Sequence, residues 1–210
     1  MKHADMPPRS LGPVPGEAAR AMILVHGRGG SAEDILSLME YLDAPDLHAV
    51  APQAAGHSWY PYSFLAPMEQ NEPYLGQALE ALAQTEQRLL DAGFGRGQLY
   101  WLGFSQGACL TLEYTARHAA RYGGIFALSG GLIGPPGTPR AYPGTFGGTP
   151  LLLGCSDTDP HIPRARVEES ADVLARMGAA VDLRLYPRAP HSVLQDEIDA
   201  IRSILAQPAV

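Results

Sequence analysis

The most informative stretch of this 210-residue chain reads Leu99-Tyr100-Trp101-Leu102-Gly103-Phe104-Ser105-Gln106-Gly107-Ala108-Cys109-Leu110. A short apolar run rich in aromatic residues leads into the pattern Gly-x-Ser-x-Gly, and an apolar run typical of a helix follows it. A strand, a tight turn and a helix in this order form a nucleophile elbow, which raises a serine hydroxyl above the edge of a sheet. Gly103 and Gly107 leave room for the sharp turn because glycine has no Cβ. The stretch therefore predicts a nucleophilic Ser105, although an incidental serine at an ordinary strand–loop–helix junction would match the same five residues.

On both sides of this stretch, segments of strand character alternate with segments of helical character. A continuous apolar run, typical of a strand buried on both faces, occupies residues 21–25. Further strands are expected over residues 47–51, 124–128 and 150–154, and residues 181–186 alternate as an edge strand does. Helical patterns occupy residues 72–90, the run after the elbow to about residue 120, residues 164–177 and residues 192–206. This alternation predicts an α/β protein whose central sheet is mostly parallel and is flanked by helices. In such sheets the functional groups gather in the loops that follow the carboxyl ends of the strands.

The remaining segments suggest how the chain is divided. Residues 1–20 are rich in proline and glycine, and we expect them to pack at the edge of the sheet, with at most a short strand over residues 11–14. After the first buried strand, Ser31 or Asp34 is expected to cap a helix that carries its apolar face as far as Leu42. No repeat, low-complexity tract or linker interrupts the chain. We therefore expect a single domain over residues 1–210, without a separate cap domain.

Composition excludes several classes of protein. The 22 acidic residues outnumber the 15 basic ones, and the resulting formal net charge of -7 argues against nucleic acid as a partner, because phosphate binding needs a basic surface. No run approaches the ~18 apolar residues of a membrane span, and the N-terminal residues lack the apolar core of a signal peptide. Cys109 and Cys155 lie in apolar runs without metal-ligand spacing, which favours free thiols in a reducing compartment. We expect a cytoplasmic protein without stable membrane insertion.

A base and an acid that could serve Ser105 both follow it in the chain, which is the order that this type of elbow requires. Of the seven histidines, His191 lies in the loop between the last strand and the last helix, where its imidazole can reach the serine. Two aspartates, Asp157 and Asp159, lie in the loop after residues 150–154. Pro160 biases Asp159 toward an extended backbone, but the residue pattern alone leaves the two aspartates nearly equivalent.

An oxyanion hole needs two backbone N–H groups that point at the developing negative charge. One is expected from Gln106, which follows the nucleophile at the N-terminus of a helix. The other is expected from Arg28 through its main-chain N–H, in the glycine-rich loop over residues 26–30. His26 precedes the elbow and adjoins a buried strand, so we expect a structural histidine that is hydrogen-bonded to the loop backbone.

Other motifs argue against a cofactor and indicate a pocket. The histidines and carboxylates do not combine at metal-ligand spacing, and the glycine-rich loop lacks a nucleotide-binding pattern, so we expect neither a metal nor another cofactor. The loop over residues 57–71 is dense in aromatic residues. Its Trp59, Tyr60 and Phe64 are expected either to line an acyl or alcohol pocket or to pack the loop onto the sheet.

Taken together and in chain order, these motifs resemble the bacterial phospholipase/carboxylesterase group of α/β-hydrolases, which includes acyl-protein thioesterases and small carboxylesterases. The matching pieces are Leu24-Val25-His26-Gly27-Arg28-Gly29, Ala51-Pro52-Gln53, Gly103-Phe104-Ser105-Gln106-Gly107, Leu128-Ser129-Gly130, Asp157-Thr158-Asp159-Pro160 and Tyr186-Pro187 with His191. They span the chain from about residue 20 to the last helix. The resemblance implies the α/β-hydrolase fold.

The resemblance also assigns roles. It makes Ser105 the nucleophile, His191 the base and Asp159, the aspartate before a proline, the acid, with the amides of Arg28 and Gln106 as oxyanion donors. It implies hydrolysis of carboxylic esters, often with short to medium acyl chains, and no cofactor. The partner expected is thus a small-molecule ester, and apolar residues around the cleft could also support a homodimer.

Three functions fit this pattern to different degrees. A serine carboxylesterase fits best. A thioesterase, a lysophospholipase or an enzyme similar to dienelactone hydrolase could use the same residues, although dienelactone hydrolases normally carry cysteine where this chain has Ser105. Arg28 stands where the thioesterases usually have a small apolar residue. A non-catalytic binding protein fits least, because such proteins usually lose one of the three catalytic residues and this chain retains all of them.

Overall fold

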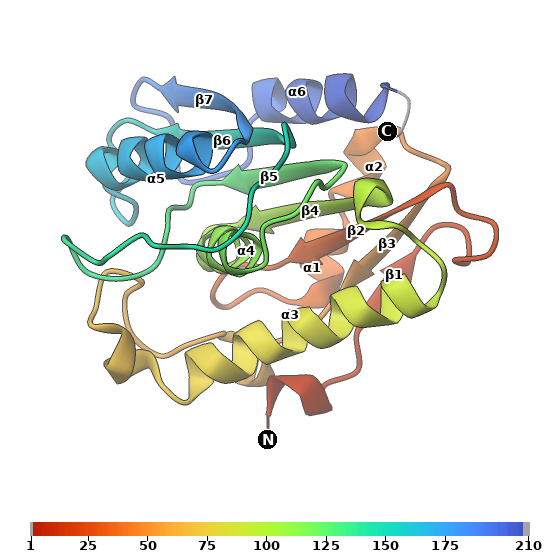
Figure 1. The fold of residues 1–210 in the computed structure, drawn as a ribbon, viewed down its shortest axis with the longest axis horizontal. Helices are drawn as coiled ribbons and strands as arrows, with labels where there is room; N and C mark the ends of the chain where they lie inside the picture. The colour runs from red at the N-terminus through yellow and green to blue at the C-terminus, as the bar shows by residue number, and fades with distance from the viewer. Residues whose placement is uncertain (1, 208–210) are drawn as a thin grey trace.

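The computed structural model describes residues 2–207 (Figure 1). Within them a central sheet has the strand order β1-β3-β2-β4-β5-β6-β7. Its strands are β1 (Arg9–Leu11), β2 (Arg20–Val25), β3 (Leu47–Ala51), β4 (Leu99–Phe104), β5 (Gly124–Leu128), β6 (Pro150–Ser156) and β7 (Ala180–Tyr186). Every neighbouring pair is parallel except β1 and β3. Met1 and residues 208–210, which the expected single domain includes, lie outside the described residues.

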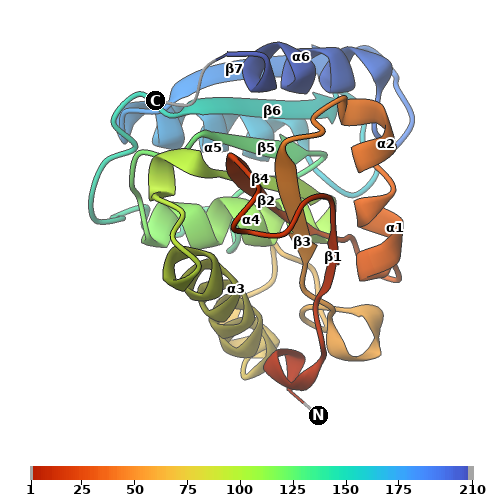
Figure 2. The same cartoon turned by 90° about the vertical axis from the view of Figure 1, so that its right-hand side faces the viewer.

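Helices cover both faces of the sheet (Figures 1 and 2). The α-helices are α1 (Ala32–Leu36), α2 (Met39–Leu42), α3 (Tyr74–Asp91), α4 (Gln106–Arg117), α5 (Arg164–Arg176) and α6 (Gln195–Leu205), and the 3-10 helices are η1 (His3–Asp5), η2 (Ala55–His57), η3 (Met68–Asn71) and η4 (Arg96–Gln98). One face packs against α1, α2 and α6, and the other against α3, α4 and α5. No helix in residues 2–207 combines the length and the apolar composition needed to cross a membrane.

Burial on both faces explains why the central strands are continuously apolar. In β2, Leu24 packs with residues of α1 and α6, whereas its neighbours Ile23 and Val25 pack with residues of α3 and α4. Successive side chains of a strand point to opposite faces, so both sets must be apolar when both faces are covered. The predicted α/β-hydrolase architecture, with a mostly parallel sheet between two helical layers, is confirmed.

Two local expectations differ from the structure. The edge strand lies at Arg9–Leu11 rather than over residues 11–14, because Gly12 adopts φ +88° and ends the extended backbone there. The helix that Ser31 caps is also shorter than expected. The Ser31 hydroxyl accepts a hydrogen bond from the Asp34 amide, as a capping residue does, but α1 ends at Leu36 and the short α2 follows it.

Candidate active site

The serine of the elbow lies between a strand and a helix in an unusual backbone conformation. Ser105 has φ 55° and ψ -118°, which is rare for a residue with a side chain, and it joins the end of β4 to the start of α4. A Cβ on Gly107 would meet the carbonyl oxygens of Val25 and His26. Glycine at this position therefore lets the N-terminus of α4 pack against the end of β2. That packing brings Ser105 beside the loop that follows β2.

Three side chains from different loops form a continuous hydrogen-bonded chain at the carboxyl ends of the strands. The Ser105 hydroxyl donates to Nε2 of His191 over 2.8 Å, and Nδ1 of His191 donates to a carboxylate oxygen of Asp159 over 2.6 Å. The carboxylate can only accept, so it fixes the imidazole tautomer that leaves Nε2 free to accept the serine proton. The structure thus brings together the three residues that the sequence singled out.

Asp159 is held more firmly than a loop carboxylate usually is. Its side chain is fully buried, and its second oxygen accepts hydrogen bonds from the backbone amides of His161 and Ile162 at 2.8 and 3.0 Å. Burial alone would raise the pKa of the Asp159 carboxyl, but the hydrogen bonds from His191, His161 and Ile162 outweigh it and hold the pKa below its usual value. The carboxylate therefore stays ionised beside the imidazole.

The other candidate acid has a different place. A carboxylate oxygen of Asp157 accepts a hydrogen bond from the Arg188 amide at 2.7 Å. Arg188 has φ 53°, so this bond supports a tight turn in the loop that leads to His191. Asp157 shapes the backbone of that loop, while Asp159 contacts the imidazole.

Two backbone amides beside Ser105 point to no other acceptor. Within residues 2–207, neither the Arg28 amide nor the Gln106 amide donates a hydrogen bond, although the neighbouring Gly29 and Gly30 amides both do. Both residues also line the cavity in which Ser105 lies. A pair of unpaired N–H groups at such a position can stabilise an oxyanion.

The cavity has a volume of about 620 Å³ and contains the sequence-predicted Tyr60 and Phe64. Apart from Ser105, His191 and the two oxyanion candidates, the other residues of its wall were not predicted to line a pocket. They are Gly27, Pro61, Tyr62, Ser63, Phe104, Cys109, His161 and Ile162. For Cys109 a signal was present, because a helical residue four positions after Ser105 lies on the same side of α4. Burial raises the pKa of the Cys109 thiol to about 12, so this thiol stays protonated at neutral pH.

Trp59 does not line this cavity, so of the two roles expected for it, pocket lining and packing of the loop, the structure shows the packing. Its side chain is fully buried, and its indole N–H donates to the His26 carbonyl oxygen at 2.8 Å. The indole packs between the rings of His3 and His26, with centroid distances of 5.4 and 5.0 Å. A buried indole needs a hydrogen-bond acceptor for its single N–H group, and a backbone carbonyl oxygen provides one here. Trp59 therefore packs its loop onto the sheet.

His26 has the structural role that its position suggested. Its Nδ1 donates to the Gly27 carbonyl oxygen at 2.7 Å, and its Nε2 accepts from the Ala54 amide at 3.1 Å. Both ring nitrogens are thus engaged with backbone groups. Burial lowers the pKa of His26, which keeps the imidazole neutral as this arrangement requires.

The side chains of both oxyanion candidates form hydrogen bonds to the loop over residues 57–71, which we call the aromatic loop. The Gln106 amide group donates to the Tyr60 carbonyl oxygen at 2.8 Å and accepts from the Trp59 amide at 2.9 Å. The Arg28 guanidinium donates to the Ser58 hydroxyl and to the carbonyl oxygens of residues 61 and 62. The side chains of these two residues therefore hold the aromatic wall of the cavity in place.

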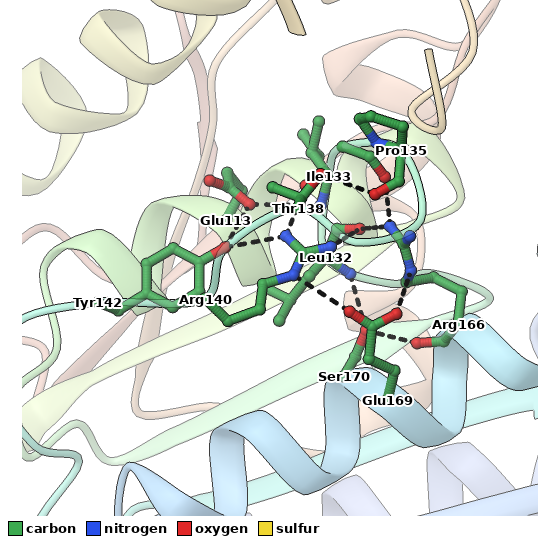
Figure 3. A network of polar contacts seen from close by, with 11 residues as sticks. Glu113, Leu132, Ile133, Pro135, Thr138, Arg140, Tyr142, Arg166, Glu169 and Ser170 are labelled. Atoms are coloured by element: carbon green, nitrogen blue, oxygen red, sulfur yellow. Dashed lines mark hydrogen bonds and ion pairs between the residues drawn. The ribbon is translucent and has the colours of Figure 1, made fainter. Parts of the chain in front are cut away.

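A buried polar network supports the part of the cavity wall that contains Phe64 (Figure 3). Arg166, which is 4% exposed, donates to the carbonyl oxygens of Leu132 and Gly134 at 2.7 and 2.5 Å and pairs with Glu169 at 2.9 Å. The Gly134 amide in turn donates to the Phe64 carbonyl oxygen at 2.7 Å. The network thus fixes the loop after β5, and that loop fixes the cavity residue Phe64.

The chain is similar to several known proteins. The phospholipase/carboxylesterase family profile matches residues 14–208. A solved phospholipase/carboxylesterase from Dyadobacter fermentans is 42% identical, with a TM-score of 0.93 over 96% of this chain and 97% of that one. Acyl-protein thioesterase 1 of Saccharomyces cerevisiae is 25% identical over 90% of this chain and 92% of that protein. A carboxylesterase from Mesorhizobium loti, at 23% identity and a TM-score of 0.74 over 97% of this chain and 95% of that one, shares the fold.

Proposed function

This chain belongs to the phospholipase/carboxylesterase family and is a hydrolase that acts on ester bonds, and on that premise we propose that it is a serine carboxylesterase. In this proposal Ser105, His191 and Asp159 form the catalytic triad, and the reaction passes through an acyl-enzyme. The observation that carries the proposal is the hydrogen-bonded chain from the Ser105 hydroxyl through both nitrogens of His191 to the buried Asp159 carboxylate.

The proton path follows from that chain. The Ser105 oxygen attacks the ester carbonyl carbon while Nε2 of His191 takes the hydroxyl proton. The ionised Asp159 carboxylate stabilises the imidazolium that results. His191 then gives the proton to the oxygen of the departing alcohol, which leaves an ester of Ser105. A water molecule, activated by His191 in the same way, hydrolyses this acyl-enzyme and releases the acid.

The negative charge that develops on the carbonyl oxygen requires two donors. The amides of Arg28 and Gln106 fill this role in the proposal, because both are unpaired among the described residues and both line the cavity at Ser105. The Gln106 amide also lies at the N-terminus of α4, where the helix dipole favours negative charge.

The cavity supports small to medium esters as substrates. Its volume of about 620 Å³ lies within the range of small-molecule sites, and Tyr60 and Phe64 give it apolar walls. A second candidate is thioester hydrolysis by the same residues. The similarity to a protein named acyl-protein thioesterase 1 over 90% of this chain favours it.

The test is hydrolysis of 4-nitrophenyl esters from acetate to palmitate, together with acyl thioesters of matched chain length. We expect activity toward the oxygen esters of short to medium chains and its loss in Ser105→Ala, by a factor of about 10⁴ or more. Higher kcat/KM toward the thioesters would favour the second candidate. A serine-directed fluorophosphonate provides a substrate-independent control. Failure of the wild type both to hydrolyse these substrates and to become labelled at Ser105 would refute the proposed mechanism.

A further inference from the structure

The cavity carries an unusual charge for this chain. The protein is acidic overall, with a formal net charge of -7, yet no Asp or Glu is among the described residues that line the cavity. Of those lining residues, Arg28 alone has a permanent charge, beside the two histidines His161 and His191. The ionised Asp159 is fully buried behind His191, so the wall itself presents one permanent cation and no carboxylate, which makes the cavity attractive to anions.

The Arg28 guanidinium is oriented but not neutralised. Its Nη1 donates to the Ser58 hydroxyl at 2.9 Å and to the Pro61 carbonyl oxygen at 3.0 Å, and its Nη2 donates to the Tyr62 carbonyl oxygen at 2.8 Å. All three acceptors are neutral groups. Among residues 2–207, no carboxylate lies within ion-pair distance of it. The positive charge is therefore available to a ligand.

Two donors of this guanidinium remain. A guanidinium has five N–H groups, and the three hydrogen bonds above leave the Nε hydrogen and one Nη2 hydrogen without an acceptor among the described residues. Two neighbouring N–H groups match the two oxygens of a carboxylate. Because three bonds already fix the plane of the guanidinium, little side-chain entropy remains to be lost on binding.

We propose that the preferred substrates carry a carboxylate near the scissile ester and that the Arg28 guanidinium binds this carboxylate. This inference rests on the proposed esterase function and adds a substrate class to it. In the proposed mechanism the Arg28 backbone N–H binds the oxyanion, and Arg28 lines the same cavity as Ser105. An anionic group on the acyl or alcohol part of a small ester can therefore reach Arg28 while the ester carbonyl lies at Ser105. Arg28 is thus a specificity-determining residue.

The experiment compares matched anionic and neutral esters. One pair places the charge on the alcohol side, as 4-acetoxybenzoate against 4-acetoxybenzamide. The other pair places it on the acyl side, as the 4-nitrophenyl monoester of adipic acid against the same ester with a terminal amide. The ratio of kcat/KM within each pair isolates the effect of the charge, because the two members are nearly the same size.

We expect the wild type to prefer the anionic member of at least one pair by about tenfold, as one partly exposed charge-assisted contact allows. Arg28→Gln should remove that preference. Arg28→Lys keeps the charge but lacks the two neighbouring N–H groups of the guanidinium, so it should retain part of the preference. Arg9→Gln removes the same charge at an exposed ion pair on the surface and should leave the ratio unchanged. In the wild type, raising the salt concentration to about 0.5 M should reduce the preference through screening.

If Arg28→Gln folds, either of two results would overturn the inference. One is a wild-type ratio near one in both pairs. The other is an Arg28→Gln variant that loses activity toward both members equally, which would make Arg28 only an anchor for the aromatic loop. If Arg28→Gln does not fold, a wild-type preference that is insensitive to salt also refutes the inference. Hydrolysis of the neutral esters by the wild type, and its loss in Ser105→Ala, tests the esterase mechanism separately from this specificity.

Discussion

His3 precedes Trp59 by 56 positions, yet its Nε2 donates a hydrogen bond of 2.9 Å to the Trp59 carbonyl oxygen. Its Nδ1 accepts a hydrogen bond of 3.0 Å from the Ala55 amide, and the imidazole is 3% exposed. The N-terminal segment thus reaches under the aromatic loop, where η1 also packs against α3 (Figure 2). The Trp59 amide donates to the side chain of Gln106. His3 is therefore connected through Trp59 to a residue next to the nucleophile.

We expect His3→Ala to reduce the free energy of unfolding by about 1–3 kcal/mol, because it leaves the part-buried amide of Ala55 and the buried carbonyl of Trp59 without a partner. Burial lowers the pKa of His3 from its ordinary value of 6.5, so the stability from the neutral imidazole is present above that value and is lost as the pH falls below it. Urea unfolding of both proteins at pH 7.5 and pH 5 checks this. The difference in the free energy of unfolding between the wild type and His3→Ala should be smaller at pH 5. The exposed Lys2→Ala serves as control.

The two aspartates of the loop after β6 should separate in kinetics. Asp159→Asn should lower kcat by about 10⁴-fold, because an amide no longer selects the imidazole tautomer that accepts the serine proton. Asp157→Asn should have little effect, since an amide oxygen can still accept from the Arg188 amide. Ester hydrolysis by both variants and the wild type measures this. Equal losses in the two variants would contradict the assignment of Asp159 as the acid.

The fold, Ser105 and His191 could be predicted because local patterns and the order of the motifs along the chain carry them. The run from Leu99 to Phe104 and the glycines around Ser105 constrain the backbone within a few positions, whereas the residue pattern did not separate Asp159 from Asp157 and only the family resemblance did. Parallel strands then bring their carboxyl ends to one edge of the sheet, whatever the lengths of the connections. Distant loops are thus placed together by topology alone.

The wall of the cavity could not be predicted in the same way. Trp59, Tyr60 and Phe64 are all aromatic residues of one loop, and composition does not say which of them faces inward. That choice depends on partners far away in sequence, such as His3 behind Trp59 and Gly134 beside Phe64. The edge strand was misplaced for a related reason, because the turn at Gly12 depends on its close approach to β3.

The network of Figure 3 should contribute measurably to stability. Arg166→Met should lower the free energy of unfolding by about 3 kcal/mol, since it leaves the buried carbonyl oxygen of Gly134 without a donor and that of Leu132 with only a 3.5 Å contact from Arg140. Arg164→Met on the same helix is the matched control. Its ion pair with Glu168 is exposed to solvent, so the Arg164 variant should lose much less stability than the Arg166 variant. Chemical denaturation measures the free energy of unfolding of both variants, and an equal loss in the two would contradict a special contribution from the buried network.

A carboxyl group is buried between α6 and β6. Glu197 is 1% exposed, accepts a hydrogen bond from the Leu194 amide at 2.8 Å, and packs against Gly154, where a Cβ would collide with its carboxyl group. Burial raises the pKa of Glu197 to about 7, although the Leu194 bond opposes this shift. The folded protein therefore holds a proton that the unfolded chain releases above its ordinary pKa of 4.5.

Protonated Glu197 should make the protein less stable as the pH rises. The contribution of Glu197 to stability is complete below pH 4.5 and is lost as the pH rises through about 7, with a total loss of about 3 kcal/mol. Glu197→Gln carries no titrating proton, so this variant should gain stability relative to the wild type between pH 5 and pH 8. Urea unfolding at both values measures the gain, with the exposed Glu40→Gln as control. A wild-type-to-variant difference that stays constant across this range would show that Glu197 is ionised in the folded protein throughout.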